Sequence, residues 1–335
     1  MTKGAVLGPR RVARAVAAVA LVVGAVGLVA RRSDLSPADT PALALSLATL
    51  ALLLLPLPAL LSGRGIALLK SLVDDRPGRL MVLPAVLLLP CLLYWSVPGN
   101  FTADGALRLL LYVAVPTALA IGPPRAWSRA AGDALVVLSL WIPVEMRLLK
   151  PSFPWPAGGA GAILAGVLGV DLLLYLMLVV RGFDPTGLVL RLGGRDLLLA
   201  TVAFVSFCAV GIPIGLVSGF LTFGVRGGGL PTMLAAAVMI LIFTGLPEEV
   251  LFRGFIQSLV ERSTGRPYLA LLIASVIFGA AHLDNGPRAP DWRYGLLATL
   301  AGLAYGWVYM RTRRILAPAI THALVDVTRA FFFKG

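Results

Sequence analysis

Apolar runs long enough to cross a lipid bilayer repeat along almost the whole chain. A helix of about 18 or more apolar residues spans the hydrocarbon core, and about eleven stretches of this sequence approach or exceed that length. Hydrophobic residues make up 59% of the chain and charged residues only 13%, whereas a soluble domain has about 25% charged residues. A soluble globule would need a larger polar surface. The sequence therefore predicts an all-α, polytopic transmembrane bundle.

We expect about 8–11 spans, of which those between residues 106 and 149 are the least regular. The expected spans are residues 12–30, 42–61, 80–97, 106–121, 133–149, 160–180, 197–220, 230–260, 268–283, 294–310 and 315–333. The first span is followed by Arg31 and Arg32 and lacks a small-residue cleavage site, so we interpret it as a retained anchor.

The net charge of +13 does not indicate nucleic-acid binding, because the basic residues lie between the apolar runs and not along one face. Lys and Arg favour alternate loops, beginning with the N-terminal one. Since such residues are enriched in cytoplasmic loops, the pattern predicts a cytoplasmic N-terminus. High Ala, Leu, Arg and Gly content suggests a GC-rich bacterial gene, and so a bacterial cytoplasmic membrane with the lipid bilayer as a partner.

Ionisable residues at membrane depth are concentrated in the last third of the chain. Each costs about 2.5–3.5 kcal/mol on insertion scales, so such positions are candidates for function. The chain has only two histidines, His282 and His322, and both lie there. The acids inside the expected spans are Glu145, Asp171, Glu248, Glu249 and Asp326.

The paired acids at 248 and 249 follow Pro247, which begins or kinks a helix. Glu249 and Arg253 are at i,i+4 with the acid first, the favoured order for an ion pair on one helix face. Glu248 projects about 100° away from that face. One carboxylate is thus neutralised and the other is available for chemistry. A buried ion pair with a second, unused carboxylate remains the alternative.

Spacing along the helices suggests that the acids meet the histidines. Residues 263–267 are expected to form a turn, with Glu248 15 residues before it and His282 15 residues after it. Both therefore lie at about the same depth. His322 lies about 10 Å nearer the membrane surface, so tilt or a break near Pro318 has to bring it to them. Asp326 is at i,i+4 from His322 and shares its helix face.

Such a cluster suits hydrolysis. A carboxylate in an apolar site is a general base, so a water between Glu248 and His282 can be deprotonated to attack a peptide carbonyl. His322 can then donate a hydrogen bond to the oxyanion. Other hydrolase signatures are missing from the sequence, including His-Glu-x-x-His, a Walker loop and Gly-x-Ser-x-Gly.

Three short motifs in this region resemble the CAAX prenyl protease and bacteriocin-processing intramembrane proteases, the CPBP or Abi family. The family motifs are Glu-Glu-x-x-x-Arg, Phe-x-x-x-His and His-x-x-x-Asn/Asp, in that order. They match, with the same order and spacing, Glu248, Glu249, Arg253, Phe278, His282, His322 and Asp326. The resemblance covers roughly residues 197–333 and includes both histidines.

The resemblance implies an intramembrane protease whose catalytic residues are Glu248, His282, His322 and Asp326. Glu249 and Arg253 then support the site. Residue 326 would stabilise the oxyanion together with His322. An Asn there donates a hydrogen bond, whereas Asp326 does so only when protonated. Alternatively, Asp326 holds the tautomer or charge of His322.

The resemblance leaves metal dependence open, because the family has also been described as metalloproteases. Glu248, His282 and His322 would then be the ligands of a zinc ion with an open fourth position. We expect a metal-free glutamate mechanism without a cofactor.

We expect two domains, residues 1–195 with transmembrane helices that carry no readable motif, and residues 196–335 as a CAAX-protease-like catalytic core. The partner would be a membrane-associated peptide or protein substrate. The alternatives are a transporter with a proton or ion relay through the buried acids, and a non-catalytic scaffold of the same fold. A transporter predicts inverted repeats, and the two halves of the sequence show no convincing similarity.

Overall fold

The computed structural model describes residues 9–30, 40–73, 77–122, 128–154, 161–184, 187–188, 190–227, 229–285 and 289–334. The described chain is almost entirely helical, which confirms the predicted all-α class. It divides into two compact units, Met1–Asp184 and Pro185–Gly335. The division falls slightly before the predicted boundary at residue 195. A catalytic role for the second unit stays a prediction at this stage.

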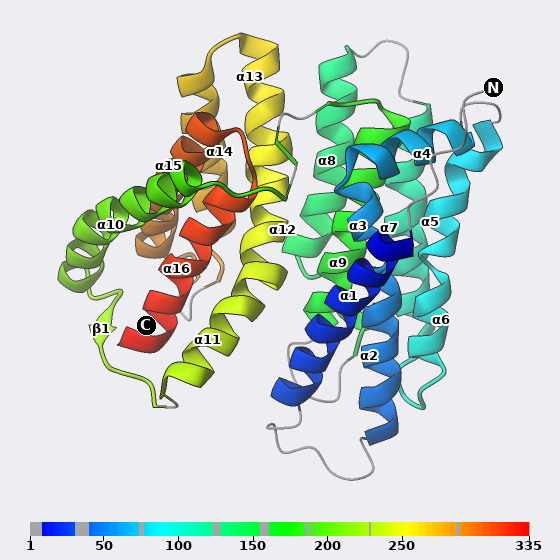
Figure 1. Cartoon of the computed structure of the whole chain (residues 1–335), viewed down its shortest axis with the longest axis horizontal. Coiled ribbons are helices and arrows are strands. Elements are labelled where there is room, and N and C mark those ends of the chain that lie inside the picture. The colour runs from blue at the N-terminus through cyan, green and yellow to red at the C-terminus, as the bar shows by residue number, and fades with distance from the viewer. Residues whose placement is uncertain are drawn as a thin grey trace. The chain divides into compact units, whose positions relative to one another are not determined.

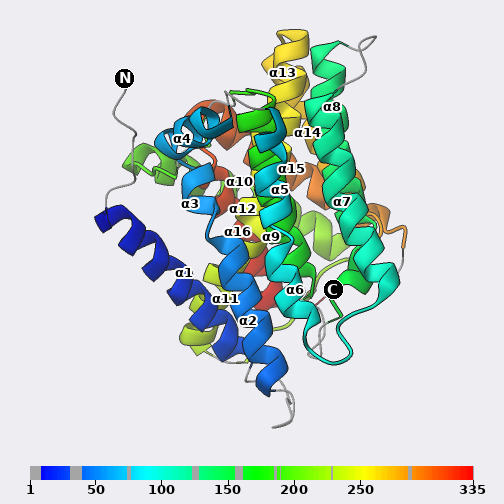
Figure 2. The same ribbon diagram turned by 90° about the vertical axis from the view of Figure 1, so that its right-hand side faces the viewer.

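The first unit consists of helices joined by short connections. Its elements are α1 Pro9–Ala30, α2 Thr40–Leu54, α3 Leu57–Leu60, α4 Gly63–Val73, the 3-10 segment η2 Pro77–Met81, α5 Val82–Val86, α6 Leu89–Trp95, α7 Ala103–Ile121, α8 Arg129–Glu145, the 3-10 segment η3 Lys150–Ser152, α9 Gly161–Leu174 and the π-helical segment η4 Tyr175–Val180. Contacts join α1 to α2, α2 to α6 and α9, and α8 to α7 and α9, and α1 lies along α2 in Figure 2.

Local sequence explains where the helices of this unit begin. The hydroxyl oxygen of Thr102 accepts a hydrogen bond from the Gly105 amide at the start of α7. Ser128 caps α8 in the same way through the Ala131 amide. Such caps satisfy backbone donors that have no partner within the helix.

The second unit contains seven α-helices among its described residues, with two π-helical segments between them. Its elements are α10 Gly194–Val217, β1 Thr222–Phe223, α11 Gly229–Ile240, the π-helical segment η5 Leu241–Gly245, α12 Leu246–Glu249, the π-helical segment η6 Val250–Gln257, α13 Ser258–Thr264, α14 Pro267–Ala281, α15 Trp292–Thr312, α16 Leu316–Phe332 and β2 Phe333–Lys334. Residues 229–264 form one long column, with α16 beside its lower half (Figure 1). Helix α10 contacts both α15 and α16.

A turn and a small ladder connect the helices of the second unit. Gly265 ends α13 in the left-handed region with φ 67°, and Pro267 begins α14, which confirms the predicted turn. Strands β1 and β2 pair antiparallel, with Thr222 opposite Lys334 and Phe223 opposite Phe333. The ladder fixes the end of α16 to the connection that precedes α11, a contact that the helical pattern does not predict.

Six helices or helix runs in the described residues are long and apolar enough to cross a membrane. They are Thr40–Leu60, Gly78–Trp95, Ala103–Ile121, Gly161–Val180, Gly194–Val217 and Gly229–Thr264. Each coincides with an expected span, and the apolar helix α14 is shorter. The remaining expected spans also correspond to helices, namely α1, α8, α15 and α16. The run of 36 residues is about 54 Å long, which exceeds the roughly 30 Å of a hydrocarbon core.

Candidate active site

The two paired acids lie in the middle of the long helix, between its two π-helical segments. Pro247 stands in the first turn of α12, after η5 and before η6. Proline removes a backbone donor, and π-helical turns inside α-helices often mark functional sites. A methyl group at Gly245 would lie 3.0 Å from the carbonyl oxygen of Ala319. The absence of a side chain there lets α16 approach the acids closely.

Glu249 is the centre of a fully buried charged cluster. Its Oε1 accepts hydrogen bonds from Nη1 of Arg253 at 3.0 Å and from Nδ1 of His322 at 2.9 Å. The side chains of Glu249 and Arg253 have no exposed surface. Arg253 also donates through Nη2 to the carbonyl oxygen of Gly302 at 2.9 Å. The predicted i,i+4 ion pair is confirmed, and it also holds His322, which the sequence spacing does not predict.

Geometry defines the tautomer of His322. Because Glu249 is paired with an arginine, its carboxylate is an acceptor only, so Nδ1 of His322 carries the proton of their hydrogen bond. The other ring nitrogen, Nε2, faces two further acids. It lies 3.5 Å from Oδ2 of Asp326 and 3.8 Å from Oε2 of Glu248. The side chains of these two acids are about one-third exposed, at 33% and 32%.

His282 lies at the end of α14 and joins the cluster through an aromatic side chain. Its Nδ1 lies 2.8 Å from the carbonyl oxygen of Phe278. Since a carbonyl only accepts, Nδ1 carries the proton, and Nε2 of the neutral ring is an acceptor. The Phe278 ring contacts the His282 ring at 4.6 Å and the His322 ring at 5.7 Å between centroids. The predicted meeting of His282 with Glu248 stays a prediction.

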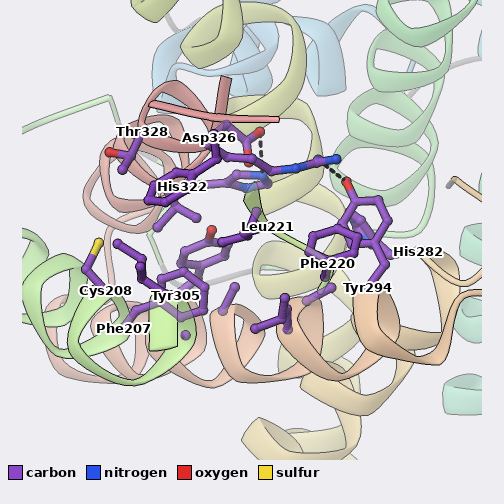
Figure 3. Close-up of a pocket in the computed structure, with 18 of the residues that line it drawn as sticks. Phe207, Cys208, Phe220, Leu221, His282, Tyr294, Tyr305, His322, Asp326 and Thr328 are labelled. Carbon is purple, nitrogen blue, oxygen red and sulfur yellow. Dashed lines mark hydrogen bonds and ion pairs between the residues drawn. The ribbon is translucent and has the colours of Figure 1, made fainter. Parts of the chain in front are cut away.

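Both histidines and Asp326 face one cavity in the second unit. Its volume is about 70 Å³, enough for several water molecules. The lining is mostly apolar and comes from α10, α14, α15, α16 and the segment around β1. It consists of Phe207, Cys208, Gly211, Ile212, Phe220, Leu221, Phe278, His282, Tyr294, Leu297, Ala298, Ala301, Tyr305, His322, Val325, Asp326, Thr328, Arg329 and Phe333. His282 and Tyr294 lie at one end in Figure 3, and Phe207 and Cys208 at the other.

A more open, polar hollow adjoins this cavity. The two share Asp326, Arg329 and Phe333 in their walls. Arg226 and Lys334 also line the hollow. The cavity and the polar hollow are therefore neighbours on the side of α16 that carries Asp326.

Two tyrosines of α15 belong to the site, and the sequence reasoning missed both. The Tyr305 ring stacks on the His322 ring with a centroid distance of 4.6 Å and an interplanar angle of 16°. The Tyr294 ring contacts His282 at 5.1 Å, and its hydroxyl accepts a hydrogen bond from Arg329 at 2.8 Å. The one signal in the sequence was Tyr305 between Gly302 and Gly306 of an apolar helix. Such a pattern more often indicates close helix packing than a functional site.

Close packing of α14 against α15 places these side chains. A methyl group at Gly279 would lie 1.9 Å from Oγ1 of Thr299, and one at Gly302 would lie 3.1 Å from Cα of Ser275. Small residues let membrane helices approach at such contacts. Gly302 also lies close to η6, where a methyl group in its place would be 3.4 Å from Nη2 of Arg253.

The alternative to a metal-free site has Glu248, His282 and His322 as metal ligands. Among the described residues, no group of three or more His, Cys, Asp or Glu side chains is placed to hold a metal ion. Glu249 engages Nδ1 of His322, and a carboxylate at one ring nitrogen leaves the other able to bind a metal. The alternative ligand set of Glu248, His282 and His322 therefore stays a prediction.

The structure thus brings five of the six expected site residues together through direct contacts. They are Glu248, Glu249, Arg253, His322 and Asp326. His282 joins them through Phe278 and through the shared cavity. The second unit is thus an apolar helical unit with clustered carboxylates and histidines beside a cavity. These features are those of a membrane protein with a buried polar site.

Comparisons with known proteins identify that class more closely. Residues 230–328 match the family model described as type II CAAX prenyl endopeptidase Rce1-like. The chain therefore carries an Rce1-like domain over these residues, and its apolar helices make it an integral membrane protein.

A relative in Bacillus subtilis (strain 168) is named "Putative membrane peptidase YdiL". It is 34% identical over 79 residues, which are 24% of this chain and 29% of the relative. The match spans less than a third of the length of that protein. No solved structure matches the chain.

Proposed function

We propose that the protein is an intramembrane endopeptidase that hydrolyses a peptide bond of a membrane-associated peptide or protein. The observation that carries the proposal is the buried Arg253–Glu249–His322 cluster, which directs Nε2 of His322 toward two further acids. The Rce1-like domain includes every residue of this cluster. The relative's name supports peptidase chemistry in general.

In the proposed reaction, Glu248 removes a proton from a water molecule whose oxygen attacks the peptide carbonyl carbon. The carbonyl electron pair moves to the oxygen and forms an oxyanion. When the tetrahedral intermediate collapses, the C–N bond breaks and the proton passes from Glu248 to the departing amine. His282, which lines the cavity and whose Nε2 is an acceptor, helps to hold the water.

His322 is proposed to stabilise the oxyanion from the other side. Glu249 is a positioning residue, because it fixes the Nδ1 tautomer as the acid of a serine-protease triad does for its histidine. Asp326 is proposed to accept from Nε2 and so to keep the imidazolium form of His322 in place. The mechanism is of the glutamate type and uses no metal.

The substrate and the setting are part of the proposal. The cavity is apolar along most of its wall and adjoins a polar hollow, which suits a peptide segment that leaves the bilayer. The composition favours a bacterial cytoplasmic membrane, with the N-terminus in the cytoplasm, and it makes a prenylated substrate the less expected one.

The proposal is tested by comparing new peptide termini in bacterial membranes that contain equal amounts of wild-type protein or Glu248→Gln. We expect a set of termini that is present with wild type and missing with the variant. That set would also identify the substrate. Identical termini in both membranes would contradict the proposal and favour a scaffold or a transporter.

A further inference from the structure

The cavity needs a hydrogen-bond donor for the carbonyl oxygen of a bound peptide, and the polar groups of its wall differ in what they can donate and where they lie. This inference rests on the proposed function. Thr328 donates its hydroxyl to the carbonyl oxygen of Leu324 at 2.7 Å. Nη1 of Arg329 donates to the Tyr294 hydroxyl at 2.8 Å, and Tyr294, which can still donate its own proton, lies at the end of the cavity beside His282 (Figure 3). Asp326, as a carboxylate, only accepts.

Neither histidine offers a free donor in its neutral form. The proton of His282 is on Nδ1, toward the Phe278 carbonyl, and that of His322 is on Nδ1, toward Glu249. Each Nε2 is then an acceptor. If His322 gains a second proton, its Nε2–H is directed toward Asp326 and Glu248, at 3.5 and 3.8 Å.

Tyr305 is the donor that lies against His322. The residue is 1% exposed, and it lines the cavity together with His322 and Asp326. Its ring is fixed on two sides, by the stack on His322 at 4.6 Å and by the Arg253 guanidinium carbon, 5.3 Å from the ring centroid. Among the contacts of the described residues, the Tyr305 hydroxyl makes no hydrogen bond. Figure 3 shows Tyr305 in the cavity that His322 and Asp326 also line.

The geometry points to Tyr305 as the catalytic residue that donates a hydrogen bond to the carbonyl oxygen of the scissile peptide bond. A phenol keeps its proton near neutral pH. It therefore donates to the oxyanion regardless of the charge on His322. Because its ring is held before substrate arrives, the donor needs no reorganisation during the reaction, which is what makes such groups effective.

The test compares Tyr305→Phe with Tyr309→Phe, one turn further along α15. Both variants keep the ring and lose one hydroxyl. The Tyr309 hydroxyl lies 3.0 Å from that of Ser258, deep in the protein. The probe is the set of membrane peptide termini that wild type creates, followed over time at matched amounts of protein, with the melting temperature measured alongside.

We expect Tyr305→Phe to slow the appearance of these termini about 10²- to 10³-fold, as for the loss of one oxyanion donor, without lowering the melting temperature. Tyr309→Phe should lower the melting temperature and leave the rate per folded molecule at the wild-type value. A wild-type rate for Tyr305→Phe would overturn the inference. So would a loss of rate that disappears after correction for folded protein.

Glu248→Gln distinguishes a failure of the role of Tyr305 from a failure of the proposed function. If that variant is inactive while Tyr305→Phe cleaves normally, only the role of Tyr305 is wrong. If Glu248→Gln cleaves as wild type does, the proposed function fails, and the inference fails with it.

Discussion

The two units bury their ionisable side chains in different ways. In the first unit, Asp133 pairs with Arg181 at 2.6 Å near the end of η4. Asp171 is completely buried in α9, and neither of its carboxylate oxygens has a hydrogen-bond partner among the described residues. In the second unit, the single carboxylate of Glu249 pairs with both Arg253 and His322, and His322 lines a cavity.

The difference indicates where chemistry is expected. A charge at membrane depth is costly, and it is retained where partners or function compensate. In the first unit, the Asp133–Arg181 pair is neutralised within itself, and Asp171 is a single acid without a cluster around it. The second unit instead joins Glu249 to Arg253 and His322, and places Nε2 of that histidine near two more acids. Clustering around a cavity, and not burial alone, distinguishes the candidate site.

The largest expected effect on stability comes from Glu249→Gln. Arg253 would become a buried charge without its carboxylate, and His322 would lose the acceptor of its Nδ1 proton. Removing one partner of a buried pair costs about 3–5 kcal/mol, so the melting temperature in detergent should fall sharply. Asp133→Asn is the matched change in the first unit. It should cost less, because Arg181 lies at a helix end and also donates to the Arg129 carbonyl. An equal or greater loss for Asp133→Asn would contradict the comparison.

A smaller effect is expected for Asp326→Asn. The amide oxygen can still accept from Nε2 of His322, so cleavage should remain within about tenfold of wild type, or about 1.4 kcal/mol. The measurement is the rate at which this variant produces the new peptide termini that the wild-type protein creates. A loss as complete as that of Glu248→Gln would contradict the supporting role of Asp326 and show that its carboxylate is as necessary as that of Glu248.

The smallest effect, and one of opposite sign, is expected for Asp171→Leu. Removing a buried carboxyl group without a partner should stabilise the protein by about 1–3 kcal/mol, visible as a higher melting temperature, with unchanged cleavage. Asp171→Asn, which keeps a polar group there, should change stability little. Loss of activity in Asp171→Leu would instead support an ion or proton relay through the first unit.

The sequence was sufficient to predict the positions of the helices and the contacts between residues of the same helix. Hydropathy located each of the six helices or helix runs of the described residues that are long enough to cross a membrane, because apolar length is what a membrane requires. The pairing of Glu249 with Arg253 and the approach of Asp326 to His322 followed from i,i+4 spacing.

Contacts between helices could not be predicted in the same way. The hydrogen bond from His322 to Glu249 depends on the close approach of α16 at Gly245. The stack of Tyr305 on His322 depends on small residues between α14 and α15. The π-helical segments on both sides of Glu248 change which residues face α16, and no spacing rule of an α-helix includes that change.

The most direct test of the central claim is the rate at which purified protein hydrolyses a peptide that contains the cleavage site identified in membranes. Wild type and Glu248→Gln would be compared in the same detergent at equal amounts of folded protein. The account predicts a fall of about 10²- to 10⁴-fold for the loss of a general base, with an unchanged melting temperature. A Glu248→Gln rate equal to that of wild type would contradict the assignment of the buried cluster as a hydrolytic site.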